Sequence, residues 1–400
     1  MFNVLNPLPA DPILNLVVEC NADNNPNKVD LGAGVYKNEQ GHTPIMSAVQ
    51  AAQSYWLEQE TTKTYISPAG LVGFNDAMID LLLGESHPAI RDKRVVGVQA
   101  PGGCGALNIA GHLIQRCNQQ RPTPATVWIS TPTWANHIPL LGSCGLHLQE
   151  YPYYDGEKQG IDFDAMMEGL SAIKEGDIVL LHGCCHNPSG ADLNHEQWRT
   201  LATFLNTKGA IPFVDVAYQG LGDGLDEDAW GMRHLAEQCP EMIIASSCSK
   251  NFGLYRERVG VVLVIAKNSV AADTSKGQLL SIARGIYSMP PNYGAALVNI
   301  ILANSALKLQ WQTELTVMRE RISGLRVDLV KQLQAAGAGS RFDYIQHEKG
   351  MFSFLGISPE QVQRLKQQHS VYMVNSSRIS VAGLSETNMP YVVESLLSVL

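Results

Sequence analysis

Lys250 follows an apolar run and the small residues 247–249, and Arg256 and Arg258 come shortly after it. A lysine placed in this way can be desolvated in a cleft. A desolvated amine loses its proton more readily, and the neutral amine is the nucleophile that forms Schiff bases with carbonyl compounds. Taken alone, the segment fits equally well a strand followed by a solvated basic loop, so other residues must decide.

Asp215 lies at the carboxyl end of the apolar run 211–216. Open α/β sheets bind their ligands at the carboxyl ends of strands. A buried acid is costly unless a cation or several hydrogen bonds meet it. Asp215 is therefore either a helix cap or structural ion pair, or the partner of a ligand cation such as a protonated pyridine nitrogen.

A glycine-rich turn, residues 102–105, follows the strand-like run 94–99 and opens a predicted helix. The free N–H groups and the positive dipole end of such a helix suit a phosphate, with Gly103 and Cys104 in the turn. The spacing is not that of the dinucleotide fingerprint, and turns of this kind without a ligand are as common.

The segment 182–190 holds two histidines and two cysteines within its first five residues, which raises the question of zinc. Adjacent cysteines lack the spacing of zinc sites, and no second cluster supplies further ligands, so we predict no metal. Asn187 instead offers a side-chain amide near the end of a strand-like run. Trp134, after the run 126–130, is either a core residue or a platform for a planar ring.

Composition narrows the class of protein. With 400 residues, 45% of them hydrophobic, the chain is long enough for two domains. Its net charge of −9, without a basic run, argues against nucleic acid and anionic membranes as partners. The N-terminus does not read as a signal peptide, no stretch is long enough to span a bilayer, and the eight cysteines then read as reduced thiols. We expect a cytoplasmic protein.

Short runs rich in β-branched residues predict an α/β fold. They are residues 94–99, 126–130, 177–183, 211–216, 241–246 and 258–266. Most gaps between them are long enough for helices, which predicts a mostly parallel sheet. The gap before 258–266 is too short for a helical crossover, so this strand should run antiparallel to its predecessor.

A smaller α+β domain is predicted from the rest of the chain. A long helical pattern covers 305–336, and a strand at 350–356 and a helix at 359–369 follow it, before two more strand candidates and a closing helix. We expect an N-terminal arm (1–10), a large domain (44–308) and a small domain (11–43 with 309–400).

The segments around residues 102, 134, 187, 215 and 250 resemble, in order and spacing, the motifs of the aspartate/aromatic branch of class I aminotransferases. These enzymes have the fold type I of pyridoxal 5′-phosphate (PLP) enzymes, and the resemblance runs nearly end to end. It implies a mixed, mostly parallel seven-stranded sheet between helices and a small α+β domain. It also implies a ping-pong transamination between an L-amino acid, aspartate or an aromatic one, and 2-oxoglutarate, through a Schiff base on Lys250.

The resemblance also implies roles for individual residues. Lys250, Asp215, Tyr218 and Trp134 match catalytic residues. Cofactor contacts are implied for Gly103, Cys104, Trp134, Asn187, Asp215, Tyr218, Ser247, Lys250 and Arg258, and for Tyr65 from the other subunit of a homodimer. Gly34, Trp134, Asn187 and Arg378 match substrate contacts, and Arg284 matches the arginine that reaches the distal carboxylate across the dimer. Two arginines suit a dicarboxylate.

Departures from the family pattern leave the preferred amino donor open. Cys104, Met289 and Ala33 replace the usual residues of the pocket, while Val35 and Lys37 look like the aspartate branch. One alternative is an enzyme that prefers aromatic amino acids. Another is a fold type I lyase or decarboxylase with the same cofactor, and a non-catalytic binding module is the third.

Overall fold

The computed structural model describes residues 1–7 and 12–400. Its contacts group the chain into two compact units. Unit 1 comprises residues 1–43, 188–190 and 321–400, and unit 2 comprises 44–187 and 191–320. The predicted N-terminal arm falls partly outside the described residues, and the predicted domain division at residue 308 stays a prediction.

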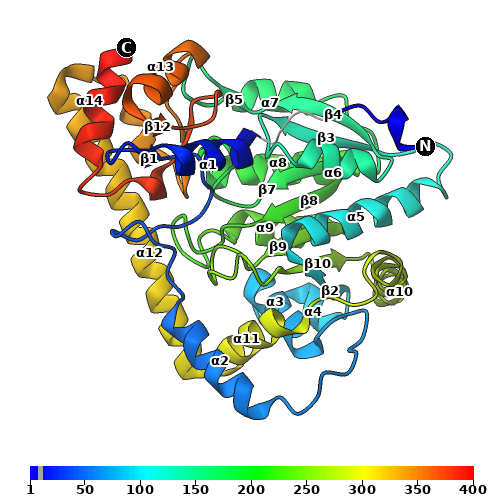
Figure 1. The fold of residues 1–400 in the computed structure, drawn as a ribbon. Coiled ribbons are helices and arrows are strands. Elements are labelled where there is room, and N and C mark those ends of the chain that lie inside the picture. The colour runs from blue at the N-terminus through cyan, green and yellow to red at the C-terminus, as the bar shows by residue number, and fades with distance from the viewer. Residues whose placement is uncertain (8–11) are drawn as a thin grey trace. The chain divides into compact units, whose positions relative to one another are not determined.

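Unit 2 contains the seven-stranded sheet that the fold class implies (Figure 1). Its strands, in spatial order, are β2 (Val95–Pro101), β10 (Val259–Ile265), β9 (Met242–Ser247), β8 (Ile211–Val216), β7 (Ile178–His182), β3 (Thr126–Thr131) and β4 (His147–Pro152). All neighbours pair in parallel except β10, which is antiparallel to both β2 and β9. The predicted direction of β10 is confirmed, because only residues 248–258 join it to β9.

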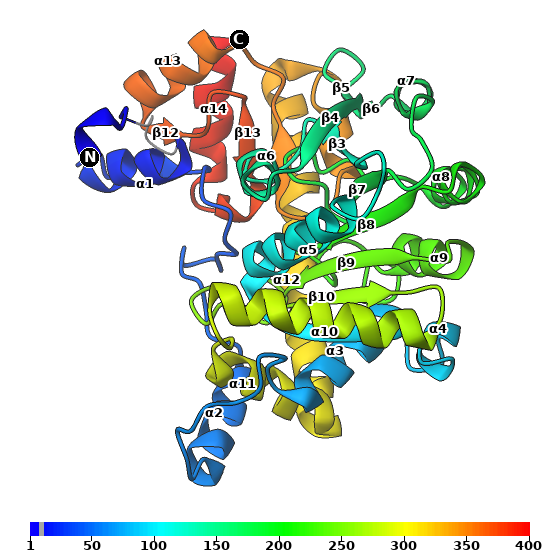
Figure 2. The ribbon, with the colours of Figure 1, turned by 90° about the vertical axis from the view of Figure 1, so that its right-hand side faces the viewer.

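Helices cover both faces of this sheet (Figure 2). Helices α5 (Gly102–Asn118) and α10 (Ser269–Ile286) pack on one face, against β2 and β10, while α3 (Val72–Leu83) contacts the same strands and also α9 (Trp230–Gln238). Helix α6 (His137–Ser143) lies on the same face as α5, and α7 (Phe163–Leu170), α8 (His195–Lys208) and α9 lie on the other face (Figure 2). This arrangement is the one that right-handed crossovers give. The central strands β8, β9 and β10, covered on both faces, are almost wholly buried.

Unit 2 contains further helices besides those already named. They are α2 (Ser47–Gln59), α4 (Pro88–Arg91), α11 (Asn292–Ala303) and the first part of α12 (Ser305–Leu333), and α11 packs against α2 and α3. A short hairpin, β5 (Tyr154–Asp155) with β6 (Gly160–Ile161), follows the edge strand β4.

Unit 1 is the predicted mixture of helices and short strands. Strand β1 (Val29–Asp30) pairs in parallel with β12 (Val371–Tyr372), and β11 (Phe352–Phe354) pairs antiparallel with β13 (Arg378–Ser380). Helices α1 (Pro12–Ala22), α13 (Pro359–His369) and α14 (Met389–Val399) and the end of α12 complete the unit. Its own apolar core includes Leu329, Phe342 and Leu396.

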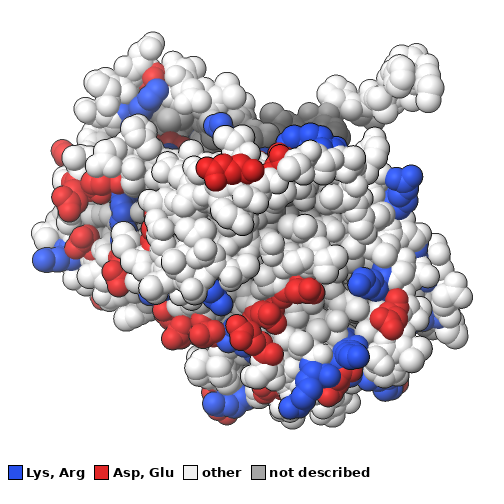
Figure 3. All heavy atoms as spheres, turned by 90° about the horizontal axis from the view of Figure 1, so that it is seen from below, with Lys and Arg blue, Asp and Glu red and all other residues white. Residues whose placement is uncertain are grey.

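The surface bears on the predicted partners. On the face that Figure 3 draws, acidic and basic side chains are interspersed, so neither sign forms a continuous field there. Within the described residues, none of the helices combines the length and the apolar character that crossing a bilayer requires.

Candidate active site

Lys250 lies in the turn that follows β9 in unit 2, and its Nζ lies 4.6 Å from the centre of the Tyr218 ring. Burial lowers the pKa of Lys250, with a contribution from Arg258, while Asp215 and Cys104 act in the opposite direction. The turn is fixed by Trp311, whose Nε1 donates to the Asn251 carbonyl over 2.7 Å. The backbone of the turn is therefore held in place, and the amine is easier to deprotonate than that of an exposed lysine.

Asp215 lies near the end of β8 and is 8% exposed. His137 Nε2 lies 3.0 Å from its Oδ2, and among the described residues no donor bonds to its Oδ1. Burial raises the pKa of Asp215, but His137, His182 and Lys250 lower it by more, so the net shift is downward. The carboxylate is held ionised with one oxygen available to a further donor.

A chain of hydrogen bonds behind Asp215 sets its orientation. Thr133 Oγ1 lies 2.8 Å from His137 Nδ1 and 3.1 Å from His182 Nε2. If His137 donates to Asp215 through Nε2, its Nδ1 accepts the Thr133 hydroxyl, and the Thr133 oxygen accepts from His182 Nε2. Burial and His137 lower the pKa of His182 to about 3, which keeps this ring neutral.

The glycine turn and Arg258 converge at the start of α5. Gly102 has φ +70, and a Cβ on it would lie 2.4 Å from Arg258 Nη2. Arg258 Nη1 donates to the Tyr255 carbonyl over 3.2 Å and to Ser249 Oγ over 3.4 Å, and Ser249 Oγ accepts from Ser247 Oγ over 2.9 Å. A guanidinium, two hydroxyls and a helix N-terminus suit a phosphate group.

Two further predicted residues follow the neighbouring strands β3 and β7, and a third, Cys104, lies at the start of α5, after β2. Trp134, after β3, meets the His137 ring edge to face at 5.2 Å. Asn187 is buried, and the turn before it is fixed by Asp192, which accepts the N–H groups of residues 185 and 186. Cys104 Sγ accepts from Asn136 Nδ2 over 3.7 Å. The carboxyl ends of β2, β3, β7 and β9 are thus followed by Cys104, Trp134, Asn187 and Lys250, and Asp215 lies near that of β8.

Tyr65 and Arg284 lie on the surface of unit 2. Tyr65 is 89% exposed, and both residues line an open pocket of about 290 Å³ together with Ile66, Ser288 and Met289. Arg284 Nη1 donates to Ser288 Oγ, and the Met289 sulfur accepts the Ile66 N–H over 3.2 Å. The sulfur of Met289, one of the departures from the family pattern, therefore joins the segments of Tyr65 and Arg284.

Gly34 and Arg378, the predicted contacts of the α-carboxylate, lie in unit 1. Arg378 begins β13 and is 5% exposed, and its Nη2 donates to the Gly32 carbonyl over 2.6 Å. Its guanidinium stacks 4.4 Å from the centre of the Phe352 ring, and a Cβ on Gly34 would lie 3.0 Å from the same ring. Phe352 therefore sets the spacing between the arginine and the Gly34 backbone.

Among the described residues, one group of three histidine, cysteine, aspartate or glutamate side chains lies close enough together to hold a metal ion. It consists of Cys184, Cys185 and Asp228. The Asp228 oxygens already accept the N–H groups of Gly220, Gly222 and Asp223, and Asp228 is therefore a loop anchor. Both thiols are buried, and their pKa values are raised. The group reads as structural, and the predicted absence of a metal stays a prediction.

His137, Thr133 and Ser249 are the site residues that the sequence did not assign. His137 and Thr133 lie in the segment that was singled out for Trp134, and polar residues at a strand exit were the available signal. Their role depends on the pairing of His137 with Asp215, which is 78 positions away. Only the folded sheet brings the two together.

The comparisons with known proteins agree with this geometry. Residues 26–396 match the family described as Aminotransferase class I and II. The chain belongs to this family. The aminotransferase is 45% identical to an aspartate aminotransferase of Haemophilus influenzae, over the whole of both chains.

Relatives that act on other amino acids are almost as similar to this aminotransferase. It is 43% identical to an aromatic-amino-acid aminotransferase of Pseudomonas aeruginosa, over 98% of this chain and 97% of the relative. Its structure matches that of an aromatic-amino-acid aminotransferase from Burkholderia pseudomallei, covalently bound to pyridoxal phosphate, with a TM-score of 0.97 and 39% identity. That match covers 100% of this chain and 99% of the other.

Proposed function

We propose that this aminotransferase uses PLP to transfer an amino group between an L-amino acid and 2-oxoglutarate, with Lys250 as the residue that binds the cofactor covalently. The observation that carries this proposal is that a buried lysine of lowered pKa lies close enough to a buried, ionised acid for each to affect the pKa of the other, in the unit that also holds the Arg258 guanidinium at a glycine turn.

The residues of unit 2 fit PLP. Arg258, Ser247 and the turn at Gly103 and Cys104 would hold its phosphate, where the hydroxyls and the guanidinium converge. Asp215 Oδ1 would accept from the ring nitrogen, because no other donor among the described residues bonds to it. Asn187, Tyr218 and Trp134 would contact the ring, and Tyr65 would reach the phosphate of the other subunit.

When bound, PLP supplies an acceptor for the electrons that the substrate α-carbon releases. Once the substrate amine has replaced it on the cofactor, the freed Lys250 Nζ would take the proton from that carbon and deliver it to the cofactor. Its lowered pKa favours the neutral amine that can accept this proton. Asp215 stays ionised throughout because His137 donates to it. Trp134, Asn187 and Tyr218 would hold the cofactor ring and the substrate in the relative orientation that the reaction requires, so that binding energy lowers the entropic cost of reaching this orientation.

The two arginines of the proposed substrate site favour a substrate with two carboxylates. Arg378, with the Gly34 backbone, would bind the α-carboxylate, and Arg284 of the other subunit would bind the distal one. Aspartate is therefore the proposed donor. Aromatic amino acids are a second class, since a relative named aromatic-amino-acid aminotransferase is almost as similar to this chain as one named aspartate aminotransferase. A PLP lyase or decarboxylase is less well supported, because the family matched is one of aminotransferases.

Assembly follows from the same assignments. We propose a homodimer with shared active sites, because Tyr65 and Arg284 are exposed side chains that resemble residues completing a neighbour's site. A cytoplasmic location and the absence of nucleic-acid partners stay predictions from the sequence.

Steady-state rates test the function. Aspartate, tyrosine, phenylalanine and tryptophan are each supplied with 2-oxoglutarate, and both the oxo acid and the glutamate formed are measured. Equal amounts of the two products and parallel lines in double-reciprocal plots are expected for a ping-pong transamination. Loss of carbon dioxide, or oxo acid formed without glutamate, would indicate a different PLP reaction.

Replacing the distal arginine tests the substrate class. In Arg284→Leu, kcat/KM for aspartate should fall by about 100-fold or more, because the second carboxylate is left unpaired, whereas kcat/KM for phenylalanine should change little. Arg116→Leu, another arginine that bonds to side chains of its surroundings, is the control. Equal losses for both substrates would assign Arg284 a structural role.

A further inference from the structure

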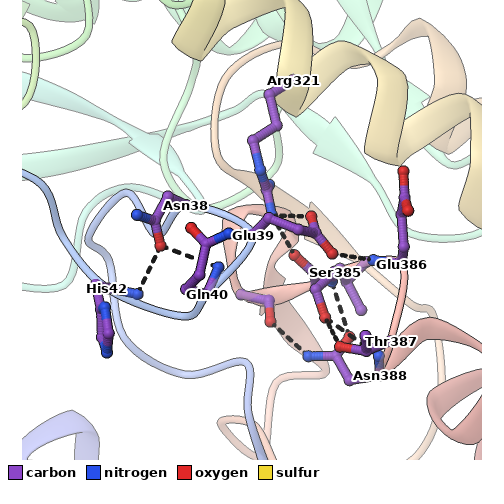
Figure 4. Close-up of polar contacts among 11 residues, drawn as sticks. Asn38, Glu39, Gln40, His42, Arg321, Ser385, Glu386, Thr387 and Asn388 are labelled. Atoms are coloured by element: carbon purple, nitrogen blue, oxygen red, sulfur yellow. Dashed lines mark hydrogen bonds and ion pairs between the residues drawn. The ribbon is translucent and has the colours of Figure 1, made fainter.

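The segment that carries Gly34 is fastened at its far end by one ion pair. Arg321, in the part of α12 that belongs to unit 1, donates through Nη2 to Glu39 Oε2 over 3.0 Å and to the Leu384 carbonyl over 3.0 Å (Figure 4). Glu39 Oε1 accepts the N–H of Glu386 over 2.7 Å. A single carboxylate therefore joins the 30–43 segment to α12 and to the chain after β13.

The near end of the same segment is fastened by different residues. Asp30 Oδ1 accepts the N–H groups of Gly32 and Ala33, and Asp30 Oδ2 pairs with Lys37 over 3.0 Å. Arg378 donates to the Gly32 carbonyl. Gly34 thus lies between two anchors, one at Asp30 and one at Glu39, and the second also holds the chain that continues from Arg378.

The Glu39 end depends on charge more than most surface pairs do. Arg321 Nε and Nη1 are buried and have no hydrogen-bond partner in the described part of the chain. Glu39 is the acid that faces this guanidinium. The side chain of Arg321 is 16% exposed and that of Glu39 is 38% exposed. Removing the charge of Glu39 would leave a largely buried cation without its counter-ion, which costs more than breaking an exposed pair.

The rest of this network holds the local shape. Asn38 Oδ1 accepts the N–H groups of Gln40 and His42, which closes the turn around Glu39. On the other side, Asn388 Oδ1 accepts the Ser385 N–H, and Ser385 Oγ accepts the Asn388 N–H. Both halves are ordered by their own hydrogen bonds, as Figure 4 shows, so the ion pair fastens them to each other at this end and is not needed for their internal folding.

We propose that Glu39 and Arg321 are positioning residues for the α-carboxylate site of Gly34 and Arg378. They touch neither substrate nor cofactor. They hold the Gly34 backbone at the distance from Arg378 at which both can bind one carboxylate. This inference rests on the proposed function, because it takes Gly34 and Arg378 as the substrate contacts.

The test compares Glu39→Gln, Glu39→Ala, Arg321→Met and the double variant Glu39→Gln/Arg321→Met. Glu39→Gln keeps the acceptor for the Glu386 N–H and removes only the charge. Its KM for aspartate should rise about 3- to 10-fold, and the rise in Glu39→Ala should be larger. The dissociation constant of succinate, measured by calorimetry on the PLP-loaded enzyme, should rise in parallel, while that of PLP for the apoprotein stays unchanged.

Glu19→Gln is the matched control. Glu19 pairs with Lys366 over 2.9 Å, and its side chain is 39% exposed, almost the same as that of Glu39, but the pair joins α1 to α13. It should leave KM and the succinate affinity unchanged. The double variant should be less impaired than the sum of the single effects, because each single change already breaks the pair.

Three results would overturn the proposal: wild-type KM and succinate affinity in Glu39→Gln, equal effects in Glu19→Gln, or a loss of PLP affinity that accompanies the rise in KM. A wild-type protein that binds PLP but does not transaminate would instead contradict the proposed function. If Glu39→Ala fails to fold, Glu39→Gln and the succinate titration still decide.

Discussion

At the scale of single residues, Lys250 is the strongest assignment. Lys250→Ala should fold and still bind PLP through the phosphate site, because Arg258 and Ser247 are untouched, but turnover should fall by at least about 10⁴-fold. Borohydride reduction of the wild type followed by peptide mapping should label Lys250. Lys276→Ala, a change on α10, is the control, and a label on any other lysine would contradict the assignment.

His182 makes folding stability depend on pH. Its pKa is lowered from 6.5 to about 3 by burial and by His137, so the unfolded chain binds a proton below pH 6.5 that the folded protein does not accept until about pH 3. Stability should therefore fall as the pH falls from 6.5 towards 3, by up to roughly 1.4 kcal/mol per pH unit.

Urea unfolding of the apoprotein at pH 7, 6 and 5 measures this slope. In His182→Asn the midpoint should depend less on pH than in the wild type, while His147→Asn, a change of an exposed histidine, should leave the slope unchanged. Identical slopes in all three proteins would mean that His182 is not the group responsible.

The sequence predicted which residues take part in the site better than it predicted which other residues they contact. The acid, the lysine and the arginines stood out by their place after apolar runs. His137 did not, because its importance lies in the 3.0 Å contact with Asp215 across the sheet. Glu39 and Arg321 are 282 positions apart, and nothing in either local segment indicates the other.

At the scale of elements, the turn between β2 and α5 has no space for a side chain. Gly102→Ala should displace the Arg258 guanidinium, because the new Cβ would lie 2.4 Å from Nη2 and φ is +70. We expect the PLP dissociation constant to rise about 10-fold or more, as for the loss of a charged hydrogen bond. Gly277→Ala, in α10 with open space around it, should leave PLP affinity unchanged. Unchanged affinity in Gly102→Ala would place the phosphate elsewhere.

Strands with a strong hydrophobic pattern were predictable from the sequence, and strands with a weak pattern were not. The central strands β7, β8, β9 and β10 are buried on both faces and read as continuous apolar runs. Strand β4 was missed as a run because it lies at the sheet edge, and most of its residues are exposed or half-buried. The reversal at β10 was predictable because the length of a connection limits its geometry.

At the scale of the whole molecule, shared sites predict complementation. Lys250→Ala lacks the covalent lysine and Arg284→Leu lacks the distal arginine, but mixed dimers contain one site with both residues intact. After subunit exchange, a 1:1 mixture should regain about a quarter of the wild-type activity with aspartate, half of the dimers being mixed with one good site each. Exchange is verified by mass spectrometry. Proven exchange without recovery would contradict cross-subunit sites.

The distribution of thiols has a practical consequence for spectroscopy. Of the eight cysteines, Cys117 alone is exposed. It lies fifteen residues along α5 from Gly102, which is about 22 Å at the rise per residue of an α-helix. The pKa of its thiol is raised, mainly because the surrounding protein partly desolvates it and also because of Glu241, so labelling is favoured at alkaline pH. Because Cys104 is half-buried and the other six cysteines are buried, a maleimide dye should react first with Cys117, far from the anion-binding end of the same helix. The native chain thus offers a fixed point for fluorescence or spin-label measurements without prior cysteine replacement.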